Sequence, residues 1–108
     1  MKRAWIRLFR RNRKDKYGFP ANSILIDVSL KEDYEQAHLV EAISVPVDMI
    51  NELFESLQKM PATIVVLSTS DEVSNLACKV LNRRGLVVFN GGDWRRFRNE
   101  FAYYSKSN

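Results

Sequence analysis

A strand, a polar loop and an amphipathic helix follow one another between residues 63 and 81, and this succession restricts the chain to few folds. The run from Thr63 to Leu67 lacks polar alternation and is mostly β-branched, which is typical of a strand buried on both faces of a parallel sheet. Five apolar residues then recur on one face of a predicted helix: Val73, Leu76, Ala77, Val80 and Leu81. In open α/β sheets, ligands bind at the loop after a central strand, so we expect any site to lie here.

Three more segments precede this unit. Residues 23–28 form an apolar strand that ends beside Asp27, residues 31–36 a short polar helix or turn, and residues 42–46 a brief strand that Pro46 stops. A helix is predicted from Asp48, as N-cap, to Gln58, because apolar residues repeat at helical spacing before Pro61.

After Gly85, which is expected to end the central helix, residues 86–89 form a last predicted strand and residues 90–92 a turn. Asp93 is expected to cap a final helix, with an aromatic stripe of Trp94, Phe97, Phe101 and Tyr104. Strands that alternate with helices predict an α/β fold, with a four- to five-stranded, mainly parallel sheet and helices on both faces.

Composition limits the class of protein. A chain of 108 residues with 45% hydrophobic content suits one compact domain, and no apolar run approaches the ~20 residues needed to span a bilayer. The single cysteine, Cys78, and the single histidine, His38, exclude an internal disulfide and a zinc centre, so we expect no metal and no cofactor. This cysteine usage suits a reducing compartment such as the cytoplasm.

The basic character belongs to one end of the chain. Residues 1–16 hold eight of the 17 basic residues and one of the 13 acidic residues, so the remainder is net acidic. We therefore divide the chain into a basic N-terminal extension, residues 1–20, and a domain, residues 21–105. The extension interleaves apolar residues with bases that could contact an anionic membrane surface or another polyanion, namely Lys2, Arg3, Arg7, Arg10 and Arg11. The alternative is a solvated extension with Trp5 or Phe9 docked on the domain.

The segment from Ile26 to Pro46 resembles, without a gap, the opening signature of rhodanese-like domains, which reads Asp-Val-Arg, Glu-Tyr, Gly-His-Ile, Gly-Ala and hydrophobic-Pro. Downstream, residues 65–68 resemble the strand that leads into the family's active-site loop, and residues 89–92 resemble its Leu-x-Gly-Gly turn. The resemblance covers nearly everything after Ala21. It implies a five-stranded sheet and a loop whose cysteine accepts a sulfane sulfur as a persulfide.

In the family, this loop runs Cys-Arg-Ser-Gly-x-Arg-Ser and surrounds an anion with backbone N–H groups and arginines. The corresponding residues here are Ser68, Thr69, Ser70, Asp71, Glu72, Val73 and Ser74. The cysteine, both arginines and the glycine are therefore replaced. Ser29 also stands where the first motif has arginine, and Arg96 where a tryptophan is usual.

These replacements change the chemistry that the loop can support. An unassisted serine hydroxyl is not a thiolate and cannot hold a persulfide, and acidic Asp71 and Glu72 would repel an anion. The run from Thr69 to Glu72 instead fits a capping box, in which Thr69 bonds the Glu72 N–H. The sequence therefore favours a non-catalytic rhodanese-like domain, a binding or regulatory module with a protein partner.

Several alternatives remain open. One is a sulfurtransferase of atypical mechanism, in which Cys78 would supply the thiol, and another is a polyanion or membrane-surface binder that acts through residues 1–16, including nucleic acid as the ligand. A hydrolase triad of Ser68, His38 and Asp27 lacks the Gly-x-Ser-x-Gly motif, so His38 is interpreted as structural. Four residues form a candidate partner surface: Trp94, Arg95, Arg96 and Arg98.

Overall fold

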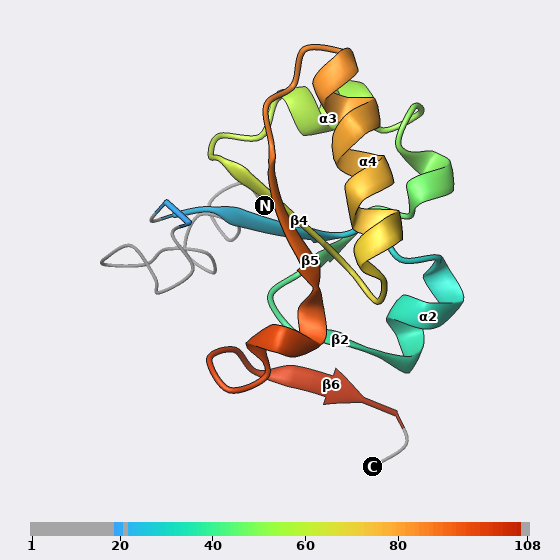
Figure 1. The fold of residues 1–108 in the computed structure, drawn as a ribbon, viewed down its shortest axis with the longest axis vertical. Coiled ribbons are helices and arrows are strands. Elements are labelled where there is room, and N and C mark those ends of the chain that lie inside the picture. Colours follow the sequence, from blue (N-terminus) through green and yellow to red (C-terminus); the bar gives the residue numbers. More distant parts are fainter. Residues whose placement is uncertain (1–18, 21, 107–108) are drawn as a thin grey trace.

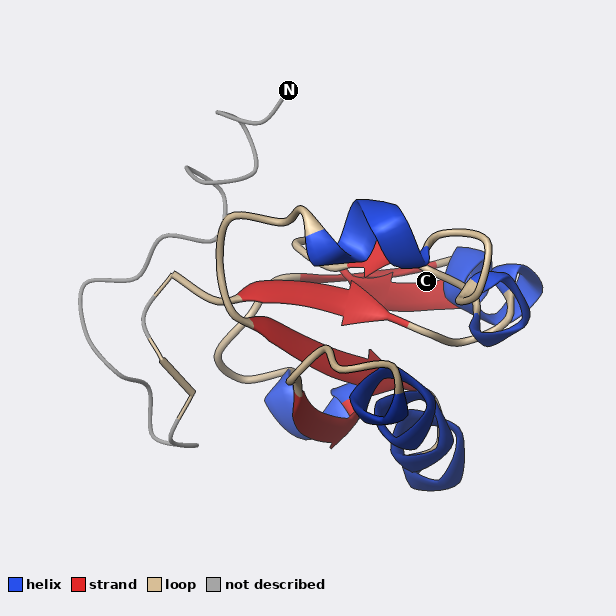
Figure 2. Ribbon diagram, turned by 90° about the horizontal axis from the view of Figure 1, so that it is seen from above, coloured by secondary structure: helices blue, strands red, loops and turns tan. Residues whose placement is uncertain are grey.

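The computed structural model describes residues 19–20 and 22–106, and it confirms the predicted α/β architecture (Figure 1). Four strands form one parallel sheet in the order β3-β1-β4-β5. These are β1 (Ile24–Asp27), β3 (Ile43–Ser44), β4 (Ile64–Ser68) and β5 (Phe89–Asp93). Helices flank the sheet (Figure 2), so the alternation of strands and helices in the sequence gives the layers that it predicts.

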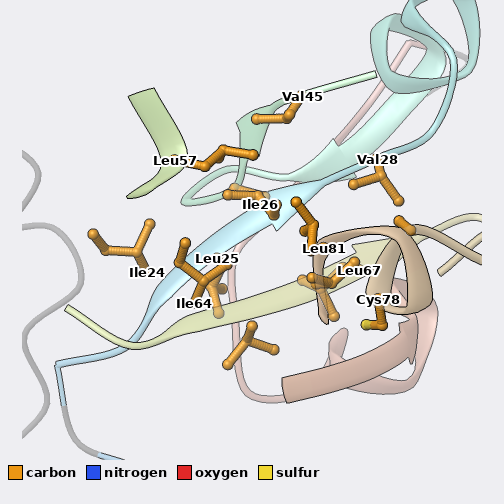
Figure 3. Close-up of a cluster of buried hydrophobic side chains, with 14 of the residues drawn as sticks. Ile24, Leu25, Ile26, Val28, Val45, Leu57, Ile64, Leu67, Cys78 and Leu81 are labelled. Atoms are coloured by element: carbon orange, nitrogen blue, oxygen red, sulfur yellow. The ribbon is translucent and has the colours of Figure 1, made fainter. Parts of the chain in front are cut away.

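The two central strands, β1 and β4, are buried along their whole length. They pair in register, with Ile26 opposite Val66 and Asp27 opposite Leu67. Apolar side chains on both faces of these strands pack against the helices, and Figure 3 shows part of this core, with Leu57 and Leu81 among the helical residues. Continuous burial explains why neither strand alternates with polar residues.

The helix that follows β4 is α4 (Asp71–Arg83), and Gly85 lies beyond it with a φ of 91°. Its buried face differs by about one position from the predicted one. Leu76 is 54% exposed, whereas Cys78 is 6% exposed and packs in the core. The predicted apolar face included Leu76 and left out Cys78, and it is wrong at both positions, because Ser74, Ala77 and Cys78 are buried instead.

The region between β3 and β4 is less regular than predicted. The polar helix α2 (Lys31–Gln36) forms as expected, but the long helix from Asp48 does not. A short 3₁₀ helix, η1 (Val47–Met49), comes first, and α3 (Phe54–Gln58) begins later. Asp48 lies inside η1 and is not an N-cap, so the apolar repeat across residues 48–58 serves two short helices.

The predicted strand at residues 86–89 is displaced toward the C-terminus, because β5 begins at Phe89 and runs through both glycines of the expected turn. A Cβ atom at Gly91 would lie 2.5 Å from Leu67 Cδ2, so only glycine lets β5 approach β4 this closely. The pairing of β4 with β5 shifts by one residue between Val66 and Leu67, where the strands accommodate the extra glycine.

The final predicted helix is also wrong. Only η2 (Trp94–Phe97), a 3₁₀ helix, forms after Asp93, and the chain then enters β6 (Tyr103–Ser105). This strand pairs antiparallel with β2 (Ala37–Leu39), which directly follows α2 and was not predicted either. The aromatic stripe is therefore split, with Trp94 and Phe97 on the buried side of η2 and Tyr104 half-exposed on β6. None of the described helices is long and apolar enough to cross a membrane.

Candidate functional site

The loop after β4 begins at Ser68, which stands where rhodanese-like domains have their cysteine and is fully buried. Its Oγ accepts a hydrogen bond from the Ser70 N–H at 3.2 Å and lies 3.4 Å from Ser29 Oγ. Ser29 Oγ in turn accepts a bond from the Thr69 N–H at 2.9 Å. The three serine and threonine residues thus bond mainly to one another, and the Ser68 hydroxyl is not exposed to solvent.

Asp27 lies at the carboxyl end of β1. Its Oδ1 accepts a hydrogen bond from the Ser29 N–H at 2.9 Å, which fixes the backbone just after this strand. The carboxyl group is fully buried, and its Oδ2 has no hydrogen-bond partner among the described residues. Burial raises the pKa of Asp27 above its usual value, and the hydrogen bonds from Ser29 only partly oppose this effect. The residue therefore positions Ser29 at the end of β1.

Ser70, rather than Thr69, caps α4. Its side chain accepts hydrogen bonds from the N–H groups of Glu72 at 3.2 Å and Val73 at 3.3 Å. The predicted capping box is wrong by one residue, because Ser70 is the extended residue before the helix, with φ −146° and ψ 130°. The N–H groups that bind an anion in related loops are thus occupied here by a side chain of the loop itself. The sequence predicted such a cap, but with Thr69 in place of Ser70.

A salt bridge links the start of α4 to η2. Asp71 Oδ2 accepts a hydrogen bond from Arg96 Nη2 at 2.7 Å, and Asp71 Oδ1 accepts the Asp93 N–H at 2.9 Å. The hydrogen bond from Arg96, followed by that from Asp93, holds the pKa of Asp71 below its usual value. We call this set of contacts the Asp71–Arg96 clasp. The clasp places Arg96 beside the loop, but the charge of Arg96 is already paired with Asp71.

Arg95 makes a second connection to the loop. Its guanidinium donates to Asp93 Oδ1 at 2.9 Å and Oδ2 at 2.7 Å, and also to the Thr69 carbonyl oxygen at 2.9 Å. The hydrogen bond from Arg95 holds the pKa of Asp93 low, and the same contact raises the pKa of Arg95. Two of the three arginines in the predicted partner surface are thus held in internal contacts.

The other members of that surface have different environments. Trp94 is 3% exposed, so its inclusion in a partner surface is wrong. The apolar ring packs inward because η2 turns its Trp94 and Phe97 side toward the core. Its indole N–H is buried without an acceptor among the described residues. Arg98 is exposed, and its guanidinium forms no ion pair or hydrogen bond with the described residues.

Beside the loop lies an open depression of about 500 Å³. Thr69 borders it on the loop side, and Trp94, Arg95 and Arg98 line it from η2 and the residue that follows. The opposite side comes from α2 and the β2–β6 pair, with Asp33, Gln36, Ala37, Tyr103 and Ser105. Trp94 and Tyr103 lie with ring centroids 6.0 Å apart. Sequence reasoning missed this depression because it depends on β6 returning to β2.

The hydrolase triad is not assembled. His38 stacks on Tyr34, with ring centroids 3.7 Å apart, and its Nδ1 lies within hydrogen-bond distance of the Tyr34 carbonyl oxygen. In the described part of the chain His38 forms no hydrogen bond to Ser68 or Asp27. The interpretation of His38 as a structural residue agrees with these contacts.

Cys78 lies within the core part of α4, and burial raises the pKa of its thiol to about 11. A thiol with this pKa is almost entirely protonated near neutral pH. Residues 22–106 and 19–20 contain no group of three histidine, cysteine or acidic side chains that could hold a metal ion. The basic residues proposed for anion contact lie outside the described residues, so that hypothesis stays a prediction.

Comparison with known families identifies the class of protein. The model of the rhodanese-like domain family matches residues 11–100. The chain therefore belongs to the rhodanese-like domain family, as the resemblance of the segment from Ile26 to Pro46 predicts. Comparison with curated proteins gives no match.

Solved structures agree on the fold. A rhodanese with anions from E. coli superposes with a TM-score of 0.66 at 24% identity, over 77% of this chain and 98% of that one. Protein hp1203 from Helicobacter pylori 26695 gives a TM-score of 0.66 at 21% identity, over 78% and 79% of the two chains. The Alr3790 protein from Anabaena sp. gives 0.64 at 20% identity, over 83% and 72%.

The contacts that link η2 to the loop were also missed at the level of sequence. Asp71, Asp93 and Arg96 appear there only as a loop position, a helix cap and a partner residue. Arg96 stands where the family has tryptophan, and Asp71 where it has glycine. Two unusual residues of opposite charge are the signal from which a salt bridge between them could have been predicted. Without the register of β5 the distance between them is not predictable.

Proposed function

We propose that this rhodanese-like domain does not transfer sulfur and serves as a binding module for a protein partner. The observation that carries the proposal is the state of the nucleophile position. Ser68 has no exposed surface, and its oxygen already accepts a hydrogen bond from the Ser70 N–H. Persulfide chemistry needs an accessible thiolate, which a buried hydroxyl does not provide.

The rest of the loop supports the same conclusion. Two N–H groups at the start of α4 are capped by Ser70, and Asp71 adds a negative charge at the same helix end. An anionic sulfur donor would have to displace the cap and approach that charge. Arg95 and Arg96 do not compensate, because each already pairs with an aspartate. The loop thus favours its own closed conformation over an anionic ligand.

Cys78 is a poor substitute for the missing thiol. It is buried in the face of α4 that packs on the sheet, and its pKa of about 11 leaves little thiolate near neutral pH. Sulfur transfer through Cys78 would need local opening of the core. The alternative of a sulfurtransferase with an atypical mechanism therefore has no support from this residue.

The test is transfer of sulfur from thiosulfate to cyanide, with mass spectrometry to detect a persulfide on the protein. We expect no turnover and no mass increase of one sulfur atom for the wild type or for Ser68→Cys/Cys78→Ala. An active rhodanese assayed in parallel is the positive control. Turnover by the wild type would overturn the proposal, and its loss in Cys78→Ala would assign the reaction to that thiol.

The Ser68→Cys/Cys78→Ala variant separates two causes of inactivity. Its single cysteine lies at the family position, within a loop whose other residues are unchanged. If it remains inactive, the capped N–H groups and Asp71 prevent sulfur transfer even when a thiol is restored at the family position. If it becomes active, the loop has kept its capacity and only the nucleophile was lost.

A further inference from the structure

A buried acceptor without a donor lies next to a buried donor without a good acceptor at the end of β1. Asp27 is fully buried, and its Oδ2 has no hydrogen-bond partner among the described residues. The hydroxyl of Ser29, which is 2% exposed, has only long contacts with other hydroxyls, 3.4 Å to Ser68 Oγ and 3.5 Å to Thr69 Oγ1. Hydrogen bonds between hydroxyl oxygens are ordinarily about 2.7–2.8 Å long, so the Ser29 proton is weakly bound in this arrangement.

The two groups are neighbours because of the turn that follows β1. Asp27 Oδ1 accepts the Ser29 N–H at 2.9 Å, and this bond fixes the Ser29 backbone beside the carboxyl. Burial raises the pKa of Asp27, and the Ser29 side chain opposes that effect, because its hydroxyl is near enough to favour the ionised form. A turn of the Ser29 hydroxyl toward Asp27 can therefore supply the donor that Oδ2 lacks.

Ser29 is also a direct link to the loop after β4. Its Oγ accepts the Thr69 N–H at 2.9 Å, and Thr69 is the second residue of the segment that corresponds to the family's active-site loop. A hydroxyl that donates to a carboxylate becomes a better acceptor, because consecutive hydrogen bonds polarise one another. A bond from Ser29 to an ionised Asp27 therefore strengthens the bond that Ser29 accepts from Thr69.

We propose that Ser29 transmits the charge of Asp27 to the loop after β4. When Asp27 is ionised, the Ser29 hydroxyl donates to the carboxylate and holds the Thr69 N–H more tightly. When Asp27 is protonated, the hydroxyl keeps its long contacts with Ser68 and Thr69, and the loop is held less tightly. The loop is thus fixed more firmly as the pH rises through the range in which Asp27 loses its proton. This device goes beyond the proposed function and does not depend on it.

The charged groups around Asp27 affect where it titrates. His38, on β2, favours the ionised carboxylate, whereas Asp33, on α2, opposes it. Burial, followed by the charge of Asp27, raises the pKa of Tyr34, which also lies on α2. The neighbouring strands β3 and β4 carry no charged side chain. None of these three residues bonds to the loop in the described part of the chain, so Ser29 is the path by which Asp27 acts on it.

Nuclear magnetic resonance of the full chain, labelled with ¹³C and ¹⁵N, tests this coupling. The carboxyl ¹³C signal of Asp27 reports its ionisation, and the amide ¹H signal of Thr69 reports the strength of its hydrogen bond. We expect the Thr69 signal to move downfield as the pH rises, with the same midpoint as the Asp27 carboxyl. The Ser70 N–H, which donates to Ser68 Oγ, is the internal control and should move less.

Three results with the wild type would each overturn the proposal. One is an Asp27 carboxyl that keeps a single charge state over the whole pH range in which the fold persists. Another is a Thr69 signal that does not move while Asp27 titrates. The last is a Thr69 signal that follows the ring signals of His38 instead of the Asp27 carboxyl.

Serine variants show which hydroxyl carries the coupling. Ser29→Ala keeps the backbone bond to Asp27 but removes the hydroxyl, and we expect it to lose most of the Thr69 shift. Ser29→Thr restores a hydroxyl and should restore the shift. Ser68→Ala is the matched control, since Ser68 is also buried but does not accept the Thr69 N–H, and it should keep the shift. A shift that survives in Ser29→Ala, or that Ser68→Ala loses equally, would contradict the assignment to Ser29.

The wild-type midpoints decide the question even where a buried substitution prevents folding. Failure here also differs from failure of the proposed function. Sulfur transfer by the wild type would contradict the non-catalytic role and leave this coupling in place, whereas a Thr69 signal that ignores Asp27 would contradict only the coupling.

Discussion

The loop after β4 and the depression beside it meet at Thr69, but they use their polar groups in opposite ways. In the loop, Ser68 and Ser70 accept backbone N–H groups, and Asp71 is paired with Arg96. In the depression, the Trp94 N–H has no acceptor and Arg98 forms no ion pair in the described part of the chain. The comparison shows that backbone and side-chain donors can be satisfied within one loop while a donor a few residues away has no acceptor.

The largest effect that we expect concerns Cys78, because a reactive thiol at this position could replace the missing cysteine of the loop. With a pKa of about 11, the folded protein should react with iodoacetamide at pH 8 about 100-fold more slowly than an unperturbed cysteine. Alkylation followed by mass spectrometry measures the rate, with the urea-unfolded chain as the control. Equal rates in the folded and unfolded protein would show that this thiol is accessible and reactive.

Removal of Gly92 should damage the clasp specifically. Gly92 has a φ of 73°, and a Cβ atom there would clash with Arg96 Nη1 and lie 2.5 Å from Asp71 Oδ1. Gly85→Ala is the matched control, because Gly85 has a φ of 91° with nothing within 4 Å of the added atom. We expect Gly85→Ala to lower the free energy of unfolding by about 1–2 kcal/mol and Gly92→Ala by roughly 1 kcal/mol more.

Urea denaturation of the two glycine variants measures that difference. If both variants lose the same stability, the clasp has no energetic role beyond the strain of a positive φ. If Gly92→Ala loses more, the contacts between Asp71, Asp93 and Arg96 are part of what keeps the loop closed.

The identity of the cap gives a smaller effect. Ser70→Ala removes the acceptor for two N–H groups of α4 and should lower the free energy of unfolding by about 1 kcal/mol. Thr69→Ala, next to it, should cost less than about 0.5 kcal/mol, since the Thr69 hydroxyl has only a 3.5 Å contact with Ser29 Oγ. Thermal unfolding of both variants decides between the two caps, and a larger effect of Thr69→Ala would restore the capping box expected from the sequence.

The smallest effect is a pH dependence with opposite signs in the two carboxyl environments. Burial raises the pKa of Asp27 in the folded state, so its contribution to stability increases as the pH falls and levels off below the unfolded pKa. Asp93 has a lowered pKa, so its contribution is present above the unfolded pKa and is lost as the pH falls through the folded one.

The free energy of unfolding of Asp27→Asn, relative to that of the wild type, should therefore be higher at pH 7 than at pH 4. Urea denaturation at the two pH values measures this change. A stability difference that stays constant with pH would show that the buried carboxyl does not titrate differently in the folded state.

The parts of the fold that the sequence predicted are those whose signals are local. The strand before Ser68 and the helix that follows it are each visible from their own apolar pattern, although the cap and the buried face of the helix lie about one residue from the prediction. The first strand ends at an acid as expected. The β2–β6 pair was missed because each strand has three residues, too few to show alternation, and because its partners are far apart in the sequence.

The candidate site divides in the same way. The replaced cysteine and arginines were visible from Ser68, Thr69 and Val73, because a resemblance of motifs fixes their positions one by one. The Asp71–Arg96 clasp and the acceptor-free Trp94 N–H were not visible. They depend on how β5 passes β4, where Gly91 permits a close approach and the pairing shifts by one residue. Such a register has no signal in a single sequence.

The pairing of β2 with β6 also determines when the depression can form during folding. Residues 37–39 meet residues 103–105 only after the whole parallel sheet between them has brought the two ends together. Contacts between such distant residues carry a large loop-closure entropy and tend to form late. A folding chain would therefore complete its central strands and the loop after β4 first, and the depression would form in one of the last steps.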